Sequence, residues 1–269
     1  MADVQKRKMV DTEHSLSAVD EKSRQGFWAV LVIMVGFTFF SPSMTAGGNL
    51  GIGLNMRDFF IAMLIGNAFL GAYTGALAYI GQSTGLTLDL LARHSFGIKG
   101  SYLPSVLISF TQIGWFGVGL AMFAIPVGEL FNVNPILLVI ITGIIMTATA
   151  YYGIKALAVL GSIAVPLIAI LGIYSVNLGI EQVNGFRNVF SENPAAPLTM
   201  SAALSIVIGS FISGGTSTPN FTRFSKTSKI AVWATVIAFF IGNSIMFVFG
   251  AVGGAVTGKP DIFDILIKK

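Results

Sequence analysis

Long apolar segments alternate with short polar ones along almost the whole chain. Between Phe27 and Met56 no Asp, Glu, Lys or Arg occurs. An uncharged segment of that length exceeds the roughly 20 residues that a helix needs to cross a bilayer. The pattern predicts seven transmembrane helices, at residues 27–50, 57–81, 101–129, 134–153, 155–178, 199–218 and 229–256.

The polar segments fit a single membrane domain. Residues 1–26 are polar and of mixed charge, and we expect a solvated cytoplasmic tail ahead of a transmembrane domain at 27–269. Residues 82–100 are too many for a tight turn and predict a short surface helix around 89–94. No linker divides the chain, so the predicted fold class is all-α, a polytopic membrane protein.

Composition excludes several classes of protein. The chain is 54% hydrophobic and 10% charged, with a mean hydropathy of +0.80, whereas soluble domains are about 25% charged. It has no cysteine and two histidines, which excludes disulfide scaffolds, cysteine nucleophiles and thiolate or histidine-rich metal centres. The basic residues flank apolar segments, as membrane topology requires, so nucleic acid is not an expected partner.

The basic residues also predict the orientation, because Lys and Arg accumulate in cytoplasmic loops. The last residues, 261–269, are amphipathic and look interrupted, so we expect the chain to be a fragment of a longer protein. With the N-terminus inside, the inner side carries Lys6, Arg7, Lys8, Lys22, Arg24, Arg93, Lys99, Lys155, Arg223, Lys226 and Lys229, against Arg57, Arg187, Lys259, Lys268 and Lys269 outside.

Two spans are predicted to be broken. The first contains Pro42, and the sixth is dense in Gly, Ser, Thr and Pro over residues 209–219. Irregular backbone at membrane depth is tolerated where it is buried or lines a cavity, and paired broken spans indicate the central site of a transporter. The alternative is that these residues only serve helix packing, which is the role we assign to Gly71 with Gly75 and to Gly250 with Gly254.

The third span supplies two candidate site residues. Gln112 and Trp115 are three positions apart and therefore share a helix face. Alone, Gln112 would form an interhelical hydrogen bond and Trp115 would lie at the membrane interface; together with the broken sixth span they favour a binding site. No ionisable residue falls at mid-depth in any span, so a proton relay is not expected. An amide, hydroxyls and the rings of Trp115 and Phe211 suit a neutral, planar, hydrogen-bonding ring.

Three segments carry a resemblance to a known family: WAVLVIMVGFTFFSPS at 28–43, QIGW at 112–115 and GSFISGGTSTPNFTRF at 209–224. With these residues the chain resembles the nucleobase:cation symporters, in particular those of bacteria that carry cytosine. The resemblance implies a fold of about twelve spans with two inverted repeats of about five, of which this chain holds the first repeat and the start of the second. It also implies a monomer in the bacterial inner membrane, with the lipid bilayer around it.

The resemblance further implies the site. Cytosine would lie between Trp115 and Phe211. Gln112, Ser210 and Ser213 would hydrogen-bond its edge. Sodium, as the coupling ion and with no other cofactor, would be held by main-chain oxygens near Gly36 and Phe39.

One departure from the family is expected to matter. The eighth span, which would complete both binding sites, lies beyond Lys269. A truncated, non-transporting fragment or assembly subunit therefore stays an alternative, as does an amino-acid permease of the same architecture. An enzyme is not expected, because no acid, base or metal ligands cluster within the spans. The sequence does not decide whether the substrate is cytosine or a close analogue, or whether the coupling ion is sodium or a proton.

Overall fold

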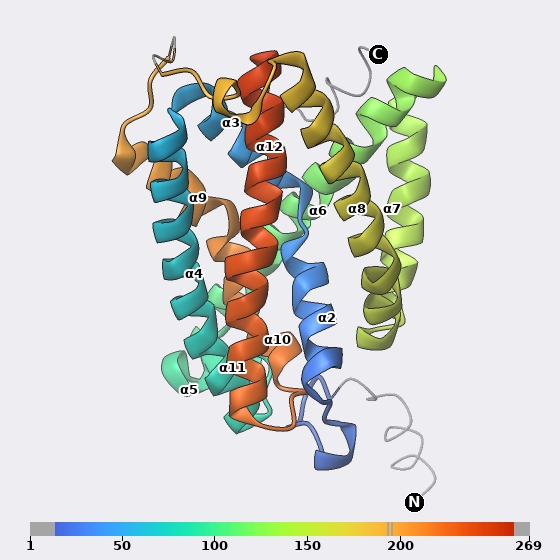
Figure 1. Ribbon diagram of the computed structural model, residues 1–269. Helices are drawn as coiled ribbons and strands as arrows, with labels where there is room; N and C mark the ends of the chain where they lie inside the picture. Colours follow the sequence, from blue (N-terminus) through green and yellow to red (C-terminus); the bar gives the residue numbers. More distant parts are fainter. Residues whose placement is uncertain (1–13, 193, 195, 261–269) are drawn as a thin grey trace, which may run out of the picture.

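The computed structural model describes residues 14–192, 194 and 196–260, and within them it forms helices and no strand (Figure 1). The elements are η1 (Glu21–Ser23), α2 (Phe27–Thr38), α3 (Ser41–Gly53), α4 (Met56–Thr84), α5 (Leu88–Gly100), α6 (Tyr102–Phe131), α7 (Pro135–Tyr151), α8 (Ile154–Gln182), η2 (Phe186–Asn188), α9 (Met200–Thr216), α10 (Pro219–Thr222), α11 (Ser228–Ile237), the π-helical turn η3 (Ala238–Gly242) and α12 (Asn243–Thr257).

Each predicted span coincides with a helix or a pair of helices, and the ends differ by a few residues. Met56–Thr84, Tyr102–Phe131, Ala158–Gln182 and Ser228–Thr257 are long and apolar enough to cross a membrane. The pair α2 and α3 would form a fifth span, bent by 53°. The apolar helices α7 and α9 are shorter, with 17 residues each. The predicted surface helix is α5, which has no buried residue.

The break in the first span is confirmed, but it lies at Phe39 and Phe40 and not at Pro42. Phe40 is extended (φ −111°, ψ 118°) and precedes α3, in which Pro42 occupies the first turn. Proline is tolerated there because the first N–H groups of a helix have no intrahelical partner. Pro42 therefore starts the second half-helix, and the two phenylalanines before it form the joint.

The sixth span is more regular than its composition suggested. Its glycines and hydroxyl residues remain helical to Thr216, and the chain breaks only at Ser217 and Thr218, before the short helix α10. Gly215 packs tightly on α4, where a Cβ would meet Thr74 Cγ2 at 2.9 Å. Figure 1 shows that α2 leads into α3 in the direction opposite to that in which α9 leads into α10.

The helices divide into a buried group and an exposed group. The buried side chains come mainly from α2, α3, α4, α9, α11 and α12, whereas α7 has no buried residue. The helices α3 and α12 touch through their backbones: a Cβ on Gly250 would overlap the carbonyl of Met44, and one on Gly254 would overlap Gly48. The packing role predicted for these two glycines is therefore confirmed.

A buried hydrogen-bond network of amide and hydroxyl side chains joins α4 to the seventh span. It lies next to the π-helical turn Ala238–Gly242, which the sequence did not predict. Asn243 Nδ2 donates to Asn67 Oδ1 at 2.8 Å, Asn67 Nδ2 donates to Ser244 Oγ at 2.8 Å, and Ser244 Oγ donates to the carbonyl of Phe240. Both asparagines are fully buried. Because the network ends on a carbonyl, which can only accept, its direction is fixed.

We expect Asn67→Leu to destabilise the fold by about 2–4 kcal/mol, because it leaves the Asn243 amide without its acceptor and Ser244 Oγ without the donor that it accepts from. The thermal unfolding midpoint in detergent measures this loss. Asn49→Leu is the matched control, since Asn49 is exposed and, among the described residues, its side chain bonds only the carbonyl of Thr45 in its own helix. Equal midpoints for the two variants would contradict a structural role of the network.

The residues just before α2 differ from the expected solvated tail. Residues 1–13 lie outside the described part of the chain, but residues 14–25 pack against the end of the helical body that also holds α10 and the start of α11 (Figure 1). Val19 is only 4% exposed. The sequence did not single out Val19, because Leu16 on the same segment is also apolar and is 79% exposed.

Candidate functional site

A cavity of about 640 Å³ lies where the break in the first span faces α6, α7, α8 and α9. None of the described residues that line it carries a charged side chain. It is mainly apolar, with Thr142 and Met146 contributed by α7 and Gly161 by α8. All the candidate residues from the sequence meet in this cavity, namely Gly36, Phe39, Gln112, Trp115, Ser210, Phe211 and Ser213.

Three aromatic rings form one wall of the cavity. Phe40 contacts Trp115 edge to face, with ring centroids 5.6 Å apart, and contacts Phe211 in the same way at 5.5 Å. Phe211 is buried and is backed by Phe37 and Phe239 at 5.1 and 5.0 Å. Phe40 was not among the predicted site residues, because a phenylalanine in an apolar span is ordinarily a packing residue. Its position at the joint, two residues before Pro42, was the available signal.

The indole of Trp115 is held from the sixth span. Its Nε1–H donates to Ser213 Oγ at 3.1 Å, across 98 residues of sequence. This bond fixes the orientation of the indole ring and engages the oxygen of Ser213 as its acceptor. Ser210, by contrast, donates its hydroxyl to the carbonyl of Val207 at 2.8 Å, so its oxygen can only accept a further hydrogen bond.

Gln112 brings an uncommitted amide into the cavity. Its Nε2 is buried and has no hydrogen-bond partner among the described residues. An unpaired buried donor costs about 1–3 kcal/mol, so a ligand that accepts from this amide would recover part of that cost. Gln112 therefore keeps a donor for a ligand, and no described residue accepts the hydroxyl hydrogen of Ser213.

The end of α2 exposes main-chain oxygens at the joint. The N–H of Phe39 donates to the carbonyl of Val35 at 2.9 Å, which is the last ladder bond of α2. The final carbonyls of a helix lack intrahelical donors, and they carry a partial negative charge. Pro42 removes one more donor, because it has no N–H. The carbonyls near Gly36 and Phe39 therefore suit a small cation.

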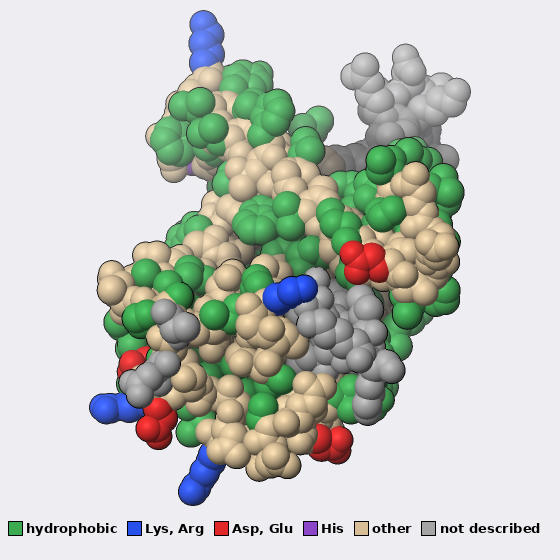
Figure 2. Space-filling model, turned by 90° about the horizontal axis from the view of Figure 1, so that it is seen from above, with side chains coloured by type: hydrophobic (Ala, Val, Ile, Leu, Met, Phe, Trp, Pro, Cys, Tyr) green, Lys and Arg blue, Asp and Glu red, His purple; other side chains and the backbone are tan. Residues whose placement is uncertain are grey.

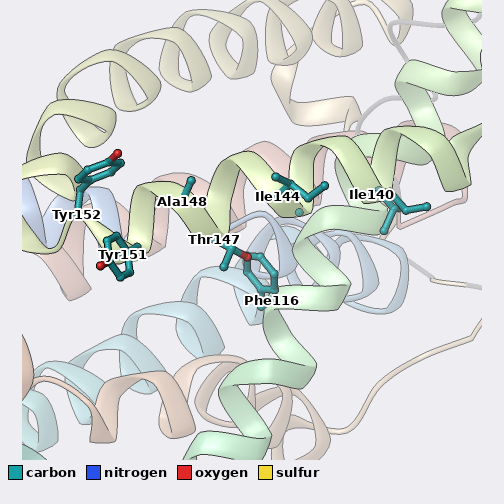
Figure 3. Close-up of a pocket in the computed structure, with 9 residues that line it drawn as sticks. Phe116, Ile140, Ile144, Thr147, Ala148, Tyr151 and Tyr152 are labelled. Carbon is teal, nitrogen blue, oxygen red and sulfur yellow. The ribbon is translucent and has the colours of Figure 1, made fainter.

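A second hollow, of about 670 Å³, lies on the outer side of α7 against Phe116 of α6 (Figure 3). It is an open apolar groove that ends at the exposed rings of Tyr151 and Tyr152. None of the candidate residues lines it. Phe116 also lines the central cavity, so this residue stands between the two.

Comparison with known proteins gives concordant matches. Residues 18–267 match the family described as permease for cytosine/purines, uracil, thiamine, allantoin. The chain is 52% identical to the cytosine permease of Escherichia coli (strain K12) over 257 residues, which cover 96% of this chain and 61% of the relative. It is 28% identical to the hydantoin permease of Microbacterium maritypicum over 191 residues, covering 64% of this chain and 38% of the relative.

Solved structures match the fold. The nucleobase-cation-symport-1 family transporter Mhp1, in a closed conformation with bromovinylhydantoin bound, superposes with a TM-score of 0.82 at 20% identity, covering 96% of this chain and 61% of that chain. The inward-facing conformation of Mhp1 gives a TM-score of 0.76 at 21% identity, with coverage of 90% and 56%. The chain thus spans about 61% of the length of the cytosine permease that it matches.

Proposed function

The chain belongs to the family of permeases for cytosine/purines, uracil, thiamine and allantoin, and from this premise we propose that it serves the sodium-coupled uptake of cytosine across the inner membrane. Membership confirms the resemblance to the nucleobase:cation symporters, the all-helical transporter fold and the assignment to a multi-pass membrane protein. The relatives are permeases and transporters and not enzymes, as the sequence analysis expected, and none of those named above is an amino-acid carrier.

The observation that carries the proposal is an uncharged cavity that combines a free amide, hydroxyl oxygens and aromatic faces between two broken spans. A buried cavity without charge disfavours an ionic substrate, whose desolvation would go uncompensated. Cytosine is neutral and planar, with an amino donor and carbonyl and ring-nitrogen acceptors on its edge. A 52% identical relative is named cytosine permease, which supports cytosine within this class of ring.

Each candidate residue has a distinct role in the proposed site. Trp115 and Phe211 offer the faces on which the base stacks, an interaction worth about 1–3 kcal/mol. The amide of Gln112 donates to a ring acceptor and its oxygen accepts from the amino group. Ser210 offers an acceptor, and Phe40 closes the aromatic wall from the joint of the first span.

Sodium supplies the driving force in this proposal, because the base itself carries no charge. The carbonyls near Gly36 and Phe39 form the part of the cation site that this chain provides. Moving one positive charge inward is worth about 2.3 kcal/mol per 100 mV, which corresponds to roughly 40-fold accumulation of the base. In this proposal the cation binds at the joint between α2 and α3, and Phe40 at the same joint forms part of the wall around the base. Sodium and the base therefore favour the same conformation of the first span.

The charge distribution supports a cytoplasmic N-terminus. Figure 2 looks onto the opposite end of the molecule, where a few acidic and basic side chains are interspersed among hydrophobic and other residues. Basic residues concentrate in the cytoplasmic loops of membrane proteins. Among the described residues, Lys22, Arg24, Arg93, Lys99, Arg223, Lys226 and Lys229 lie toward the N-terminal end, against Arg57, Arg187 and Lys259 at the other.

Uptake of radiolabelled cytosine tests the function, in bacteria that lack their own cytosine permease and express the protein as its gene encodes it. We expect uptake that requires sodium outside, is abolished by a sodium ionophore and is lost when choline replaces sodium in the medium. Uptake that follows the proton gradient and ignores sodium would overturn the coupling, and absence of uptake would overturn the function.

We predict that Ser213→Ala weakens cytosine binding by about 2–10-fold, because Trp115 loses a hydrogen bond worth about 0.5–1.5 kcal/mol. The dissociation constant is measured for the purified protein in both the native and the Trp115→Phe background, since the phenyl ring has no N–H. If Ser213 acts by holding the indole, Ser213→Ala should not change the dissociation constant further in the Trp115→Phe background, where the hydrogen bond is already absent. An equal loss in both backgrounds would instead indicate direct contact with the base.

A further inference from the structure

Residues 14–25 lie as a strap across the N-terminal end of the helical body (Figure 1). The N–H of Val19 donates to the carbonyl of Gly85, just after α4, at 3.0 Å. Gln25 forms a parallel bridge with Ser225, and its carbonyl accepts from the N–H of Lys226 at 2.9 Å. The strap is thus bonded through its backbone to the second span and to the loop that follows the broken sixth span.

Arg223 fixes the start of the strap. The side chain is only 5% exposed, and its Nη1 donates to the carbonyl of His14 at 2.7 Å. Its Nε donates to the carbonyl of Asn220 at 3.2 Å, and its guanidinium lies 4.6 Å from the centre of the Phe224 ring. Arg223, which the sequence suggested only as a marker of membrane topology, therefore binds the first residue of the strap.

Val19 is the point at which the strap enters the helical body. It packs with Ile33 of α2 and Phe224 in an apolar cluster, which also contacts Phe221 of α10 and Ala158 of α8. Ile33 and Phe221 line the central cavity as well. The cluster therefore lies at this end of the cavity, and it joins Val19 to residues of both broken spans and to Ala158 of α8.

We propose that the strap is part of the inner gate of the transporter, with Val19 as its plug. The proposal rests on the proposed function, because a gate has meaning only for a protein that releases a substrate on this side. To leave the cavity toward the N-terminal side, the base must pass between Ile33, Phe221 and Ala158, and Val19 with Phe224 covers that path. Opening this end parts the cluster that holds Val19 from Ala158 of α8. The main-chain bonds to Gly85 and Lys226 can persist, since Gly85 follows α4 and Lys226 follows the broken sixth span.

Labelling of a cysteine introduced into the cavity tests the plug without any need for transport, because the chain has no cysteine of its own. Thr142→Cys places a thiol in the cavity, and a membrane-impermeant thiol reagent is added from the side on which Leu16→Cys is labelled. We expect Val19→Gly to raise the labelling rate of the Thr142→Cys protein about tenfold. Leu16→Gly is the matched control, since Leu16 lies on the same strap and is 79% exposed. Equal rates for Val19→Gly and Leu16→Gly would overturn the proposal.

A cross-link supplies the second test, which does not depend on the stability of Val19→Gly. The pair Val19→Cys and Ala158→Cys, treated with a short bifunctional thiol reagent that can be reduced, is expected to form a cross-link. The cross-link should preserve cytosine binding from the opposite side and reduce uptake to background, and reduction should restore uptake. Leu16→Cys with Ala158→Cys is the control pair. Failure to cross-link, or undiminished uptake by the cross-linked protein, would overturn the plug. If the reduced protein shows no uptake either, the proposed function fails, and the labelling result still decides whether Val19 closes the cavity.

Discussion

Replacing Trp115 by alanine is expected to weaken cytosine binding by roughly 10–100-fold and to reduce uptake to near background. Stacking of a base on an aromatic ring is worth about 1–3 kcal/mol, and each 1.4 kcal/mol is a tenfold change in affinity. The loss extends beyond stacking, because Phe40 rests edge to face on Trp115 and would no longer be held there. Titration of the purified protein with cytosine measures the affinity, and initial rates of uptake measure transport.

Two further variants make this prediction specific. Trp233→Ala removes the same ring from α11, where Trp233 is 60% exposed and does not line the cavity, and it should bind cytosine normally. Trp115→Phe retains a stacking face and loses the hydrogen bond to Ser213, so its affinity should fall between those of the native protein and Trp115→Ala. If Trp115→Ala bound cytosine as tightly as Trp233→Ala does, the base would not stack on Trp115.

Phe40 constrains how a base can occupy the aromatic wall. Its ring contacts both Trp115 and Phe211, the two faces between which the base is proposed to lie. A base inserted between them must therefore displace Phe40 or stack against it. Phe40 lies at the joint between α2 and α3, beside the carbonyls proposed for sodium. Movement of this one residue would couple the occupied cavity to the geometry of the cation site.

The spans could be predicted from the sequence because each apolar segment is long enough to cross a membrane and is bounded by charges. The sequence predicted that the first span is broken, but not at which residue. Proline disrupts a helix when it lies inside it, whereas Pro42 lies in the first turn of α3 and is accommodated there. The π-helical turn Ala238–Gly242 was not predicted, since no proline or polar residue marks it. The turn lies against α2 and α4, and the sequence of a single segment does not reveal such neighbours.

The residues of the site could be predicted from the sequence, but the hydrogen bonds between them could not. Gln112 and Trp115 were found because an amide and an indole on one helix face need partners in an apolar span. The same reasoning applied to Asn67 and Asn243 would have predicted the buried network that joins the second and seventh spans. That Trp115 pairs with Ser213 depends on how α6 crosses α9, and helical periodicity within either segment carries no information about that crossing.

The contact between α3 and α12 predicts the largest effect on stability. A Cβ on Gly250 would overlap the main-chain carbonyl of Met44, and a backbone cannot give way as a side chain can. Gly250→Ala must therefore push α3 away from α12. Overpacking costs typically 1–3 kcal/mol and sometimes more, and we expect a loss of about 3 kcal/mol or above. For a domain of this size that lowers the unfolding midpoint by roughly 6–12 °C.

Gly117→Ala is the control that separates this clash from the general effect of adding a methyl group. A Cβ on Gly117, in α6, would meet no atom of the described part of the chain within 4 Å, and alanine favours a helix over glycine by up to about 1 kcal/mol. Its unfolding midpoint should equal or exceed that of the native protein. Gly250→Ala should also weaken cytosine binding, because α3 continues directly from the joint at Phe40. A midpoint for Gly250→Ala within about 2 °C of the control would mean that the two backbones do not meet at this residue, and the joint would then owe its position to other contacts.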